Sequence, residues 1–107
     1  MHIQLTRELE WDEAKRRANY AKHRLDFRDA EQVFQGITLT AEDDRQDYGG
    51  KRFISLGLLE EMVVVVVHTA RSEKTRIISM RKANQREKQA YEEKVFFGRE
   101  APPEFKG

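Results

Sequence analysis

The sequence has 107 residues, a formal net charge of +1 and no cysteine. This length is typical of one domain, and the lack of cysteine excludes disulfide bonds, thiolate chemistry and cysteine-ligated metal sites in this chain. Hydrophobic residues make up 38% and charged residues 36% of the chain, which favours a folded domain with a very polar surface over a disordered one.

The beginning of the sequence has no apolar stretch that could form the core of a signal peptide. The longest apolar run, 62–67, is too short to span a bilayer. We therefore expect a cytoplasmic protein that does not enter a membrane.

The first third of the chain predicts a short edge strand at 3–9 and then two helices. Asp12 is suited to cap the first helix. Apolar residues then recur at steps of three and four and predict one helical stripe, formed by Trp11, Ala14, Ala18, Ala21 and Leu25, whose alanines let the helix approach its neighbour closely. Asp26 is suited to cap the second helix, which should end near Gly36.

The middle of the chain changes to the period of β-structure. We expect a strand at 37–40 and a mobile acidic loop at 41–50. Three further strands are predicted at 52–58, 62–69 and 74–81. The valine run 63–67 is apolar on both faces, so both faces of its sheet must be covered. The two helices can cover one face, and the last helix, the tail or a partner protein must cover the other.

Asn84 and Glu87 fit a capping box for a last helix that runs to about residue 96. The predicted fold is therefore an α+β domain, an antiparallel β-sheet with two N-terminal helices and one C-terminal helix. We expect it to occupy residues 1–98, with a flexible tail at 99–107.

Motifs for metals and cofactors are missing from the sequence. It has no glycine-rich phosphate loop and no pair of histidines at ligand spacing. The acidic cluster at 42–47 lacks the pattern of a calcium loop and is interpreted as a solvated segment. We expect neither a metal ion nor a cofactor.

Basic residues gather around the predicted strands: Lys51, Arg52, His68, Arg71, Arg76 and Arg81. Two interpretations of the arginines remain open. Arg76 or Arg81 could form an ion pair with Glu61, Asp12 or Glu87, or the arginines could face an open groove that accepts phosphate. The hairpin register also remains open, because a slip of one residue moves His68 to the opposite face of the sheet.

RNA cleavage makes the groove interpretation chemically coherent. The 2′-hydroxyl of RNA can attack the neighbouring phosphate, so the reaction needs proton transfer and charge stabilisation rather than a metal-bound water. We predict His68 for proton transfer and three arginines for charge stabilisation, namely Arg52, Arg76 and Arg81. If His68 lies in a sealed core, proton transfer passes to Lys15 or Tyr91.

Other residues are candidates for binding RNA: Lys15, Lys22, Lys51, Arg71 and Tyr91. Lys15 and Lys22 could instead merely flank the first helix, and Tyr91, like Trp11, could belong to the core rather than stack on bases.

In their order and spacing, these residues resemble the BrnT ribonuclease toxins of bacterial type II toxin–antitoxin systems. The resemblance runs from about residue 10 to 93. Its matching pieces include Glu10-Trp11-Asp12, Lys22-His23, Val66-Val67-His68-Thr69-Ala70-Arg71 and Arg76-Ile77-Ile78-Ser79-Met80-Arg81. Arg24 departs from the pattern, because glycine is usual at that position.

This resemblance implies a RelE-like fold and a metal-independent endoribonuclease that cleaves RNA and inhibits translation. It implies neutralisation by a BrnA-like antitoxin with a ribbon-helix-helix part, and a toxin dimer within a heterotetramer. Operator DNA would be contacted only through the antitoxin, and dependence on the ribosome stays open. The alternative is a non-catalytic binding module of the same fold that acts through an antitoxin or DNA partner. A domain with no nucleic-acid role would show no salt-sensitive affinity for RNA.

Overall fold

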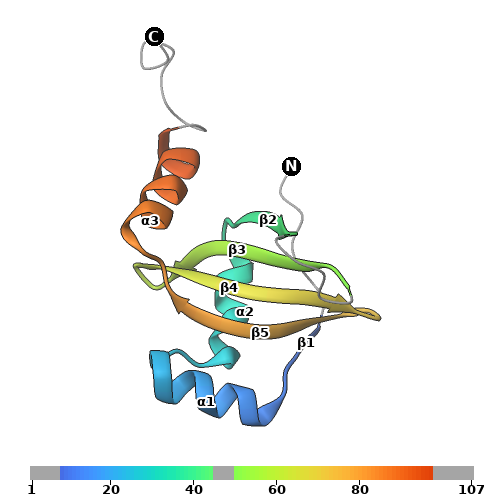
Figure 1. Cartoon of the computed structure of the whole chain (residues 1–107). Coiled ribbons are helices and arrows are strands. Elements are labelled where there is room, and N and C mark those ends of the chain that lie inside the picture. The colour runs from blue at the N-terminus through green and yellow to red at the C-terminus, as the bar shows by residue number, and fades with distance from the viewer. Residues whose placement is uncertain (1–7, 45–49, 98–107) are drawn as a thin grey trace.

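The computed structural model describes residues 8–44 and 50–97. Its elements, in chain order, are β1 (Glu8–Glu10), α1 (Glu13–His23), the 3₁₀ turn η1 (Phe27–Asp29), α2 (Ala30–Gln35), β2 (Leu39–Asp43), β3 (Arg52–Leu59), β4 (Met62–Arg71), β5 (Lys74–Lys82), α3 (Gln85–Glu92) and the π-helical turn η2 (Glu93–Phe97). The expected α+β class, a sheet combined with three α-helices in the described ranges, is confirmed (Figure 1).

The five strands form one sheet in the order β1-β5-β4-β3-β2. Strands β2 to β5 are antiparallel to their neighbours, but β1 runs parallel to β5, with Glu10 opposite Arg76. The expectation of a wholly antiparallel sheet is therefore wrong at this edge. β1 and β5 are far apart in the sequence, and such distant neighbours can pair in either direction because no tight hairpin joins them.

Local capping signals place the helices as predicted. The Asp12 side chain accepts a hydrogen bond from the backbone N–H of Lys15 at 3.1 Å and begins α1. Asp26 caps η1, which leads directly into α2, and the capping box of Asn84 and Glu87 begins α3. The helix α1 ends at His23, and its C-cap residue Arg24 has a φ of 61°, which lies in the left-handed region that favours glycine.

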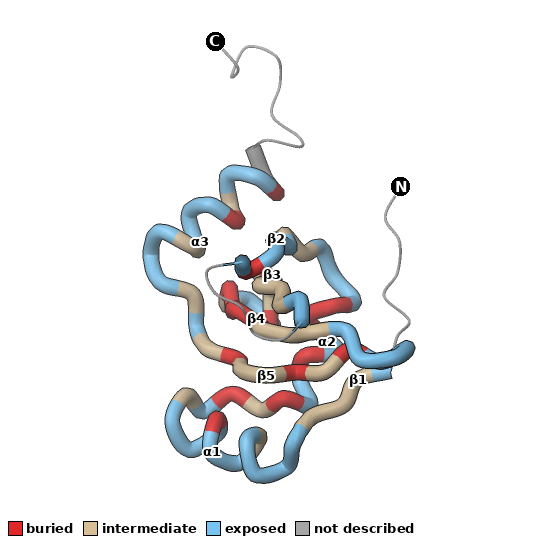
Figure 2. Tube along the Cα trace, turned by 45° about the vertical axis from the view of Figure 1, so that its right-hand side comes forward, coloured by how far each residue is buried: buried red, intermediate tan, exposed pale blue. Residues whose placement is uncertain are grey.

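The stripe predicted for α1 is correct at its ends, where Leu25 is buried and Trp11 packs against the core, but its alanines do not approach a neighbouring element as expected. Ala14, Ala18 and Ala21 are exposed, and the buried residue of this helix is Asn19 (Figure 2). The Asn19 amide donates to the carbonyl oxygens of Leu25 and Met80 and accepts from the backbone N–H of Met80. Helix α1 is therefore held beside β5 by a polar side chain, while its alanines face outward.

Two hydrophobic clusters cover the two faces of the sheet. On one face η1 and α2 contribute Phe27, Val33 and Phe34, which pack with Val64 and Val66. On the other, Tyr91 and Val95 pack with Val63 beside partly buried Leu56 and Leu58. Of the three covers that the sequence left open for the second face, the last helix, the tail or a partner protein, the segment of α3 and η2 supplies part. Figure 1 shows α3 over one end of the sheet.

Several predicted segments differ in their bounds or lie outside the described residues. β2 begins two residues later than expected and extends into the predicted loop at 41–50, of which 45–49 are not described. Most of the strand predicted at 3–9 and the whole tail at 99–107 also lie outside the described ranges. No helix within those ranges is long and apolar enough to cross a membrane.

Candidate functional site

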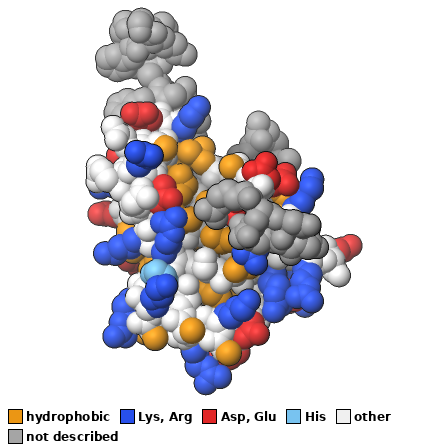
Figure 3. All heavy atoms as spheres, viewed as in Figure 1, with side chains coloured by type: hydrophobic (Ala, Val, Ile, Leu, Met, Phe, Trp, Pro, Cys, Tyr) orange, Lys and Arg blue, Asp and Glu red, His pale blue; other side chains and the backbone are white. Residues whose placement is uncertain are grey.

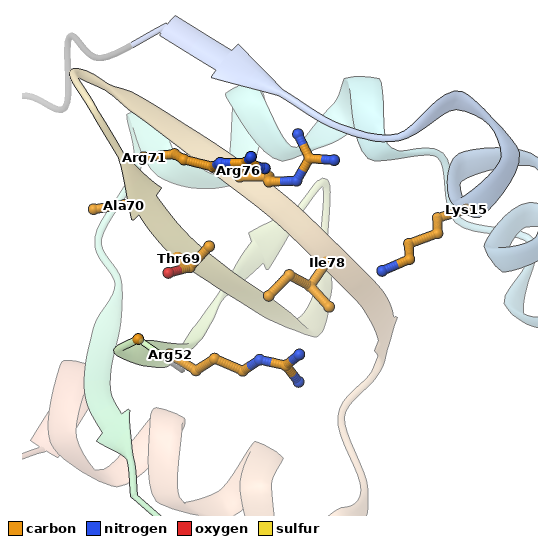
Figure 4. A pocket seen from close by; sticks show the side chains of 8 residues that line it. Lys15, Arg52, Thr69, Ala70, Arg71, Arg76 and Ile78 are labelled. Carbon is orange, nitrogen blue, oxygen red and sulfur yellow. The ribbon is translucent and has the colours of Figure 1, made fainter. Parts of the chain in front are cut away.

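An open pocket of about 390 Å³ lies near the point where β4 ends and β5 begins (Figure 4). Its lining residues are Lys15, Gly50, Arg52, Thr69, Ala70, Arg71, Arg76 and Ile78. The four cationic side chains come from four elements, α1, β3, β4 and β5. In Figure 4 the side-chain ends of Lys15 and Arg52 point toward the space beside Ile78.

Strand geometry explains why arginines reach this pocket. Thr75 and Ile77 are buried, and neighbouring residues of a strand point to opposite faces, so Arg76 projects away from the α2 side. Arg76 lies opposite Thr69, and Arg71 lies opposite Lys74 at the hairpin end. Lys15 enters from the first turn of α1, which the Asp12 cap starts. The tertiary fold thus brings together charges that are up to 61 positions apart in the chain, Lys15 and Arg76.

The charge of the pocket is strongly positive. None of its eight lining residues is acidic or a histidine. Glu10 is an acidic partner of the lining residue Arg76: its Oε2 is 3.4 Å from the guanidinium Nη1 of Arg76, and both side chains are 28% exposed. Arginine forks match the geometry of phosphate oxygens, so the pocket is suited to a phosphate group.

His68 lies on the α2 side of the sheet and does not line the pocket. A bulge between Val67 and His68 places His68 opposite Ile77. The His68 ring meets Phe34 edge-on, with centroids 5.0 Å apart, and stacks on Phe53 at 5.8 Å. The register left open by the sequence therefore separates His68 from Arg76.

A short polar chain ends at His68. Its Nε2 is 2.8 Å from the hydroxyl of Ser55, and that hydroxyl is 2.7 Å from the hydroxyl of Thr40. Ser55 is fully buried, and burial lowers the pKa of His68 to about 4. At neutral pH the imidazole is therefore uncharged. It lies between the rings of Phe34 and Phe53 and is hydrogen-bonded to Ser55.

Arg81 and Tyr91 lie away from the pocket in structural contacts. Arg81 donates two hydrogen bonds to Glu87, at 2.9 and 2.8 Å, and these bonds lower the pKa of Glu87. This is one of the ion pairs that the sequence left open. The Tyr91 side chain is 1% exposed, its hydroxyl donates to the carbonyl of Ile37, and burial raises its pKa.

Two predicted RNA-binding lysines are exposed but do not line the pocket. Lys22 lies in the last turn of α1, and Lys51 directly precedes β3. The backbone carbonyl of Lys51 accepts a hydrogen bond from the Thr69 hydroxyl, so Lys51 lies beside the pocket wall. The pocket therefore unites four of the predicted site residues, Lys15, Arg52, Arg71 and Arg76.

Sequence reasoning missed Glu10 as the partner of Arg76. The pairing follows from the parallel register of β1 and β5, in which these two residues are opposite each other. No local pattern encodes that register. In the part of the chain that the structure describes, no three His, Cys, Asp or Glu side chains form a group that could hold a metal ion.

Comparison with known proteins identifies one family model. The model is described as ribonuclease toxin, BrnT, of type II toxin–antitoxin system, and it matches residues 11–87. All residues that line the pocket lie within this match. No curated protein matches the chain.

Proposed function

This chain belongs to the BrnT family of ribonuclease toxins of type II toxin–antitoxin systems, and on that basis we propose that it is a metal-independent endoribonuclease that inhibits translation. The observation that carries the proposal is the pocket, where Lys15, Arg52, Arg71 and Arg76 converge without an acidic lining residue.

The chemistry of RNA suits such a pocket. The 2′-oxygen attacks the adjacent phosphorus and the bond from phosphorus to the 5′-oxygen breaks, leaving a 2′,3′-cyclic phosphate and a 5′-hydroxyl. The phosphate gains negative charge along the way, and cations already in place stabilise that charge more than they stabilise the ground state. We assign Arg52, Arg71 and Arg76 to this role.

Lys15 is the proposed proton donor to the leaving 5′-oxygen. Its side chain enters the pocket from α1, opposite Arg52 (Figure 4). The two other candidates are less well placed. His68 lies on the α2 side of the sheet and is hydrogen-bonded to Ser55, and the Tyr91 hydroxyl donates its hydrogen bond to the carbonyl of Ile37. The proton of the 2′-hydroxyl passes to solvent, to which the pocket is open.

We propose that His68 acts indirectly. Its hydrogen bond to Ser55 and its ring contacts hold β4 just before Thr69, which lines the pocket. Replacing His68 with glutamine, which can still bond to Ser55, should therefore preserve cleavage better than replacing it with alanine.

Family membership implies an antitoxin partner and an RNA substrate. We propose that the partner is a BrnA-like antitoxin with a ribbon-helix-helix part, and that two toxins and two antitoxins form a heterotetramer. We also propose that this chain has a RelE-like fold and a cytoplasmic location. Operator DNA is contacted through the antitoxin. Mixing the purified chain with such an antitoxin should yield one complex by light scattering and abolish cleavage.

The test of the activity is a gel of a defined single-stranded RNA incubated with the purified chain in EDTA. We expect fragments with 2′,3′-cyclic phosphate ends, and a loss of roughly 100-fold or more in rate for Arg76→Ala or Lys15→Ala. Lys88→Ala is the matched control, since Lys88 is an exposed lysine of α3 that does not line the pocket. Intact RNA, with and without ribosomes, would refute the enzyme and leave the non-catalytic binding module.

A further inference from the structure

Helix α1 and its C-cap residue carry three exposed basic side chains that the pocket does not use, Arg17, Lys22 and Arg24, while Arg16 is mostly buried and paired with Glu13 and Asp26. Between residues 15 and 24 the sequence has five Lys or Arg and no Asp or Glu. Apart from Lys15, these residues do not line the pocket. Figure 3 shows Lys and Arg side chains gathered over the lower part of the molecule, where Figure 1 places α1.

Tyr20 is an exposed aromatic ring within this basic helix. It is 44% exposed, one of two large hydrophobic side chains that are exposed in the described residues. The guanidinium carbon of Arg24 lies 5.7 Å from the centre of the Tyr20 ring. An arginine over an aromatic ring is an arrangement on which a nucleic-acid base can stack.

A hollow of about 300 Å³ adjoins Tyr20, lined by Arg16, Arg17, Tyr20, Asp26 and Arg28. Its one acidic residue is already paired, since Asp26 accepts from Arg16 at 3.0 Å and Arg28 at 2.8 Å, and hydrogen bonds from Arg28 lower its pKa to about 2. The Arg17 side chain is 72% exposed, and its contact with Glu13 is long, at 3.9 Å. Arg17 can therefore turn toward a phosphate at little cost.

The exposed alanines connect this hollow with the pocket. With about 100° per residue, the surface of α1 from the pocket side to the hollow presents, in order, Lys15, Lys22, Ala18, Ala21, Arg17 and Tyr20, and Arg24 follows the helix as its C-cap residue. Ala18 and Ala21 therefore form a strip without long side chains, with Lys22 on one side and Arg17 on the other. Ala18 and Ala21 are exposed, so this part of α1 is free to contact another molecule.

We propose that this outer surface of α1, defined by Arg17, Ala18, Tyr20, Ala21 and Arg24, binds single-stranded RNA on one side of the cleavage point. One base stacks on Tyr20, and Arg17 contacts a phosphate. The inference rests on the proposed function, because it extends the same substrate from Lys15 across α1. An acidic peptide is a less suitable ligand for this surface than RNA. The alanine strip offers little apolar area to hold a protein side chain, and a peptide brings no base to stack on the Tyr20 ring.

The experiment measures the affinity of the purified chain for a fluorescent 20-nucleotide RNA made uncleavable by 2′-O-methylation. Tyr20→Leu should weaken binding roughly tenfold, the scale of one base–aromatic stack, whereas Tyr20→Phe keeps the ring and should stay near the wild-type affinity. Arg17→Gln should lower the slope of log affinity against log salt by about 0.7, the value for one phosphate contact of a single strand.

Controls separate this proposal from the proposed activity. Because the RNA cannot be cleaved, the affinity is measured whether or not the chain is a ribonuclease. Unchanged affinity in Tyr20→Leu, or an equal loss in Lys88→Ala, would overturn the α1 surface. A second measurement compares the binding of a poly-glutamate peptide to wild type and to Tyr20→Leu. If the peptide also binds the variant tenfold more weakly, the surface is a protein-docking site and the proposal is overturned.

Discussion

Arg76 stands between two anions, the carboxylate of Glu10 and the proposed phosphate. The 3.4 Å separation and the partial exposure of both side chains make the existing pair weak. Substrate can therefore displace Glu10 from Arg76, and removing the Glu10 charge should favour substrate.

We predict that Glu10→Gln strengthens binding of uncleavable RNA about two- to fivefold. Glu8→Gln is the matched control, since it removes the same charge from the same strand, where Glu8 is 4.0 Å from Lys74 rather than beside Arg76. Fluorescence anisotropy at fixed salt measures both. An equal gain in the two variants would show that only net charge matters.

His68 should make the stability of the protein depend on pH. Its pKa is about 4 in the fold and near 6.5 in an unfolded chain, so the unfolded state binds more protons between these values. The contribution of neutral His68 is therefore fully present above pH 6.5 and is lost as pH falls toward 4. The loss should reach at most about 3 kcal/mol.

Urea unfolding at pH 7.0, 5.5 and 4.5 checks this prediction. Wild type should lose more unfolding free energy over this range than His68→Gln, which has no titrating ring. Asp26, with a pKa of about 2, responds only at lower pH and does not interfere. Identical pH dependence in the two proteins would place His68 in solvent-like surroundings.

At the scale of the elements, α1 is attached by hydrogen bonds rather than by an apolar face. Asn19 satisfies both backbone groups of Met80 and the carbonyl of Leu25. A buried backbone group left without its partner costs about 1–3 kcal/mol.

We therefore predict that Asn19→Leu lowers the free energy of unfolding by about 2–4 kcal/mol, although leucine is more hydrophobic. Ala18→Leu, one position earlier on the exposed side, should change it by no more than about 0.5 kcal/mol. Circular dichroism during urea unfolding compares the two. A larger loss of unfolding free energy in Ala18→Leu than in Asn19→Leu would mean that the alanine stripe, not Asn19, contacts the sheet.

At the scale of the whole molecule, the net charge of +1 conceals a basic pocket and a basic helix. These two surfaces are continuous through Lys15, so a bound RNA should release several counterions. The field that matters for binding is local, and the overall charge does not describe it.

We predict that a fourfold rise in salt, from 50 to 200 mM, weakens RNA binding roughly tenfold or more. The measurement is a salt titration of affinity for the uncleavable RNA. Lys88→Ala should leave the slope unchanged, while Arg52→Ala should reduce it. A slope near zero in wild type would refute binding through phosphates.

The positions of the secondary-structure elements could be predicted from the sequence, and the composition of the site only in part. Asp12, Asn84 and Glu87 begin helices through hydrogen bonds that span three residues, so a short window contains the whole interaction. The strands from β3 to β5 were placed within about two residues by the same local signals. Four predicted cations do meet in one pocket, but the pairing of Arg76 with Glu10 was not foreseen.

By itself, the sequence determined the helix caps, the order of the strands along the chain, the family resemblance and the residue types available for phosphate. Only the tertiary structure decided that β1 pairs in parallel with β5, that Asn19 rather than alanine faces the sheet, and that His68 lies on the face opposite Arg76. The physical reason is that capping energies arise between neighbours in the chain. The direction of β1, the packed side of α1 and the bulge beside His68 depend instead on contacts between distant segments, which exist only once the sheet has formed.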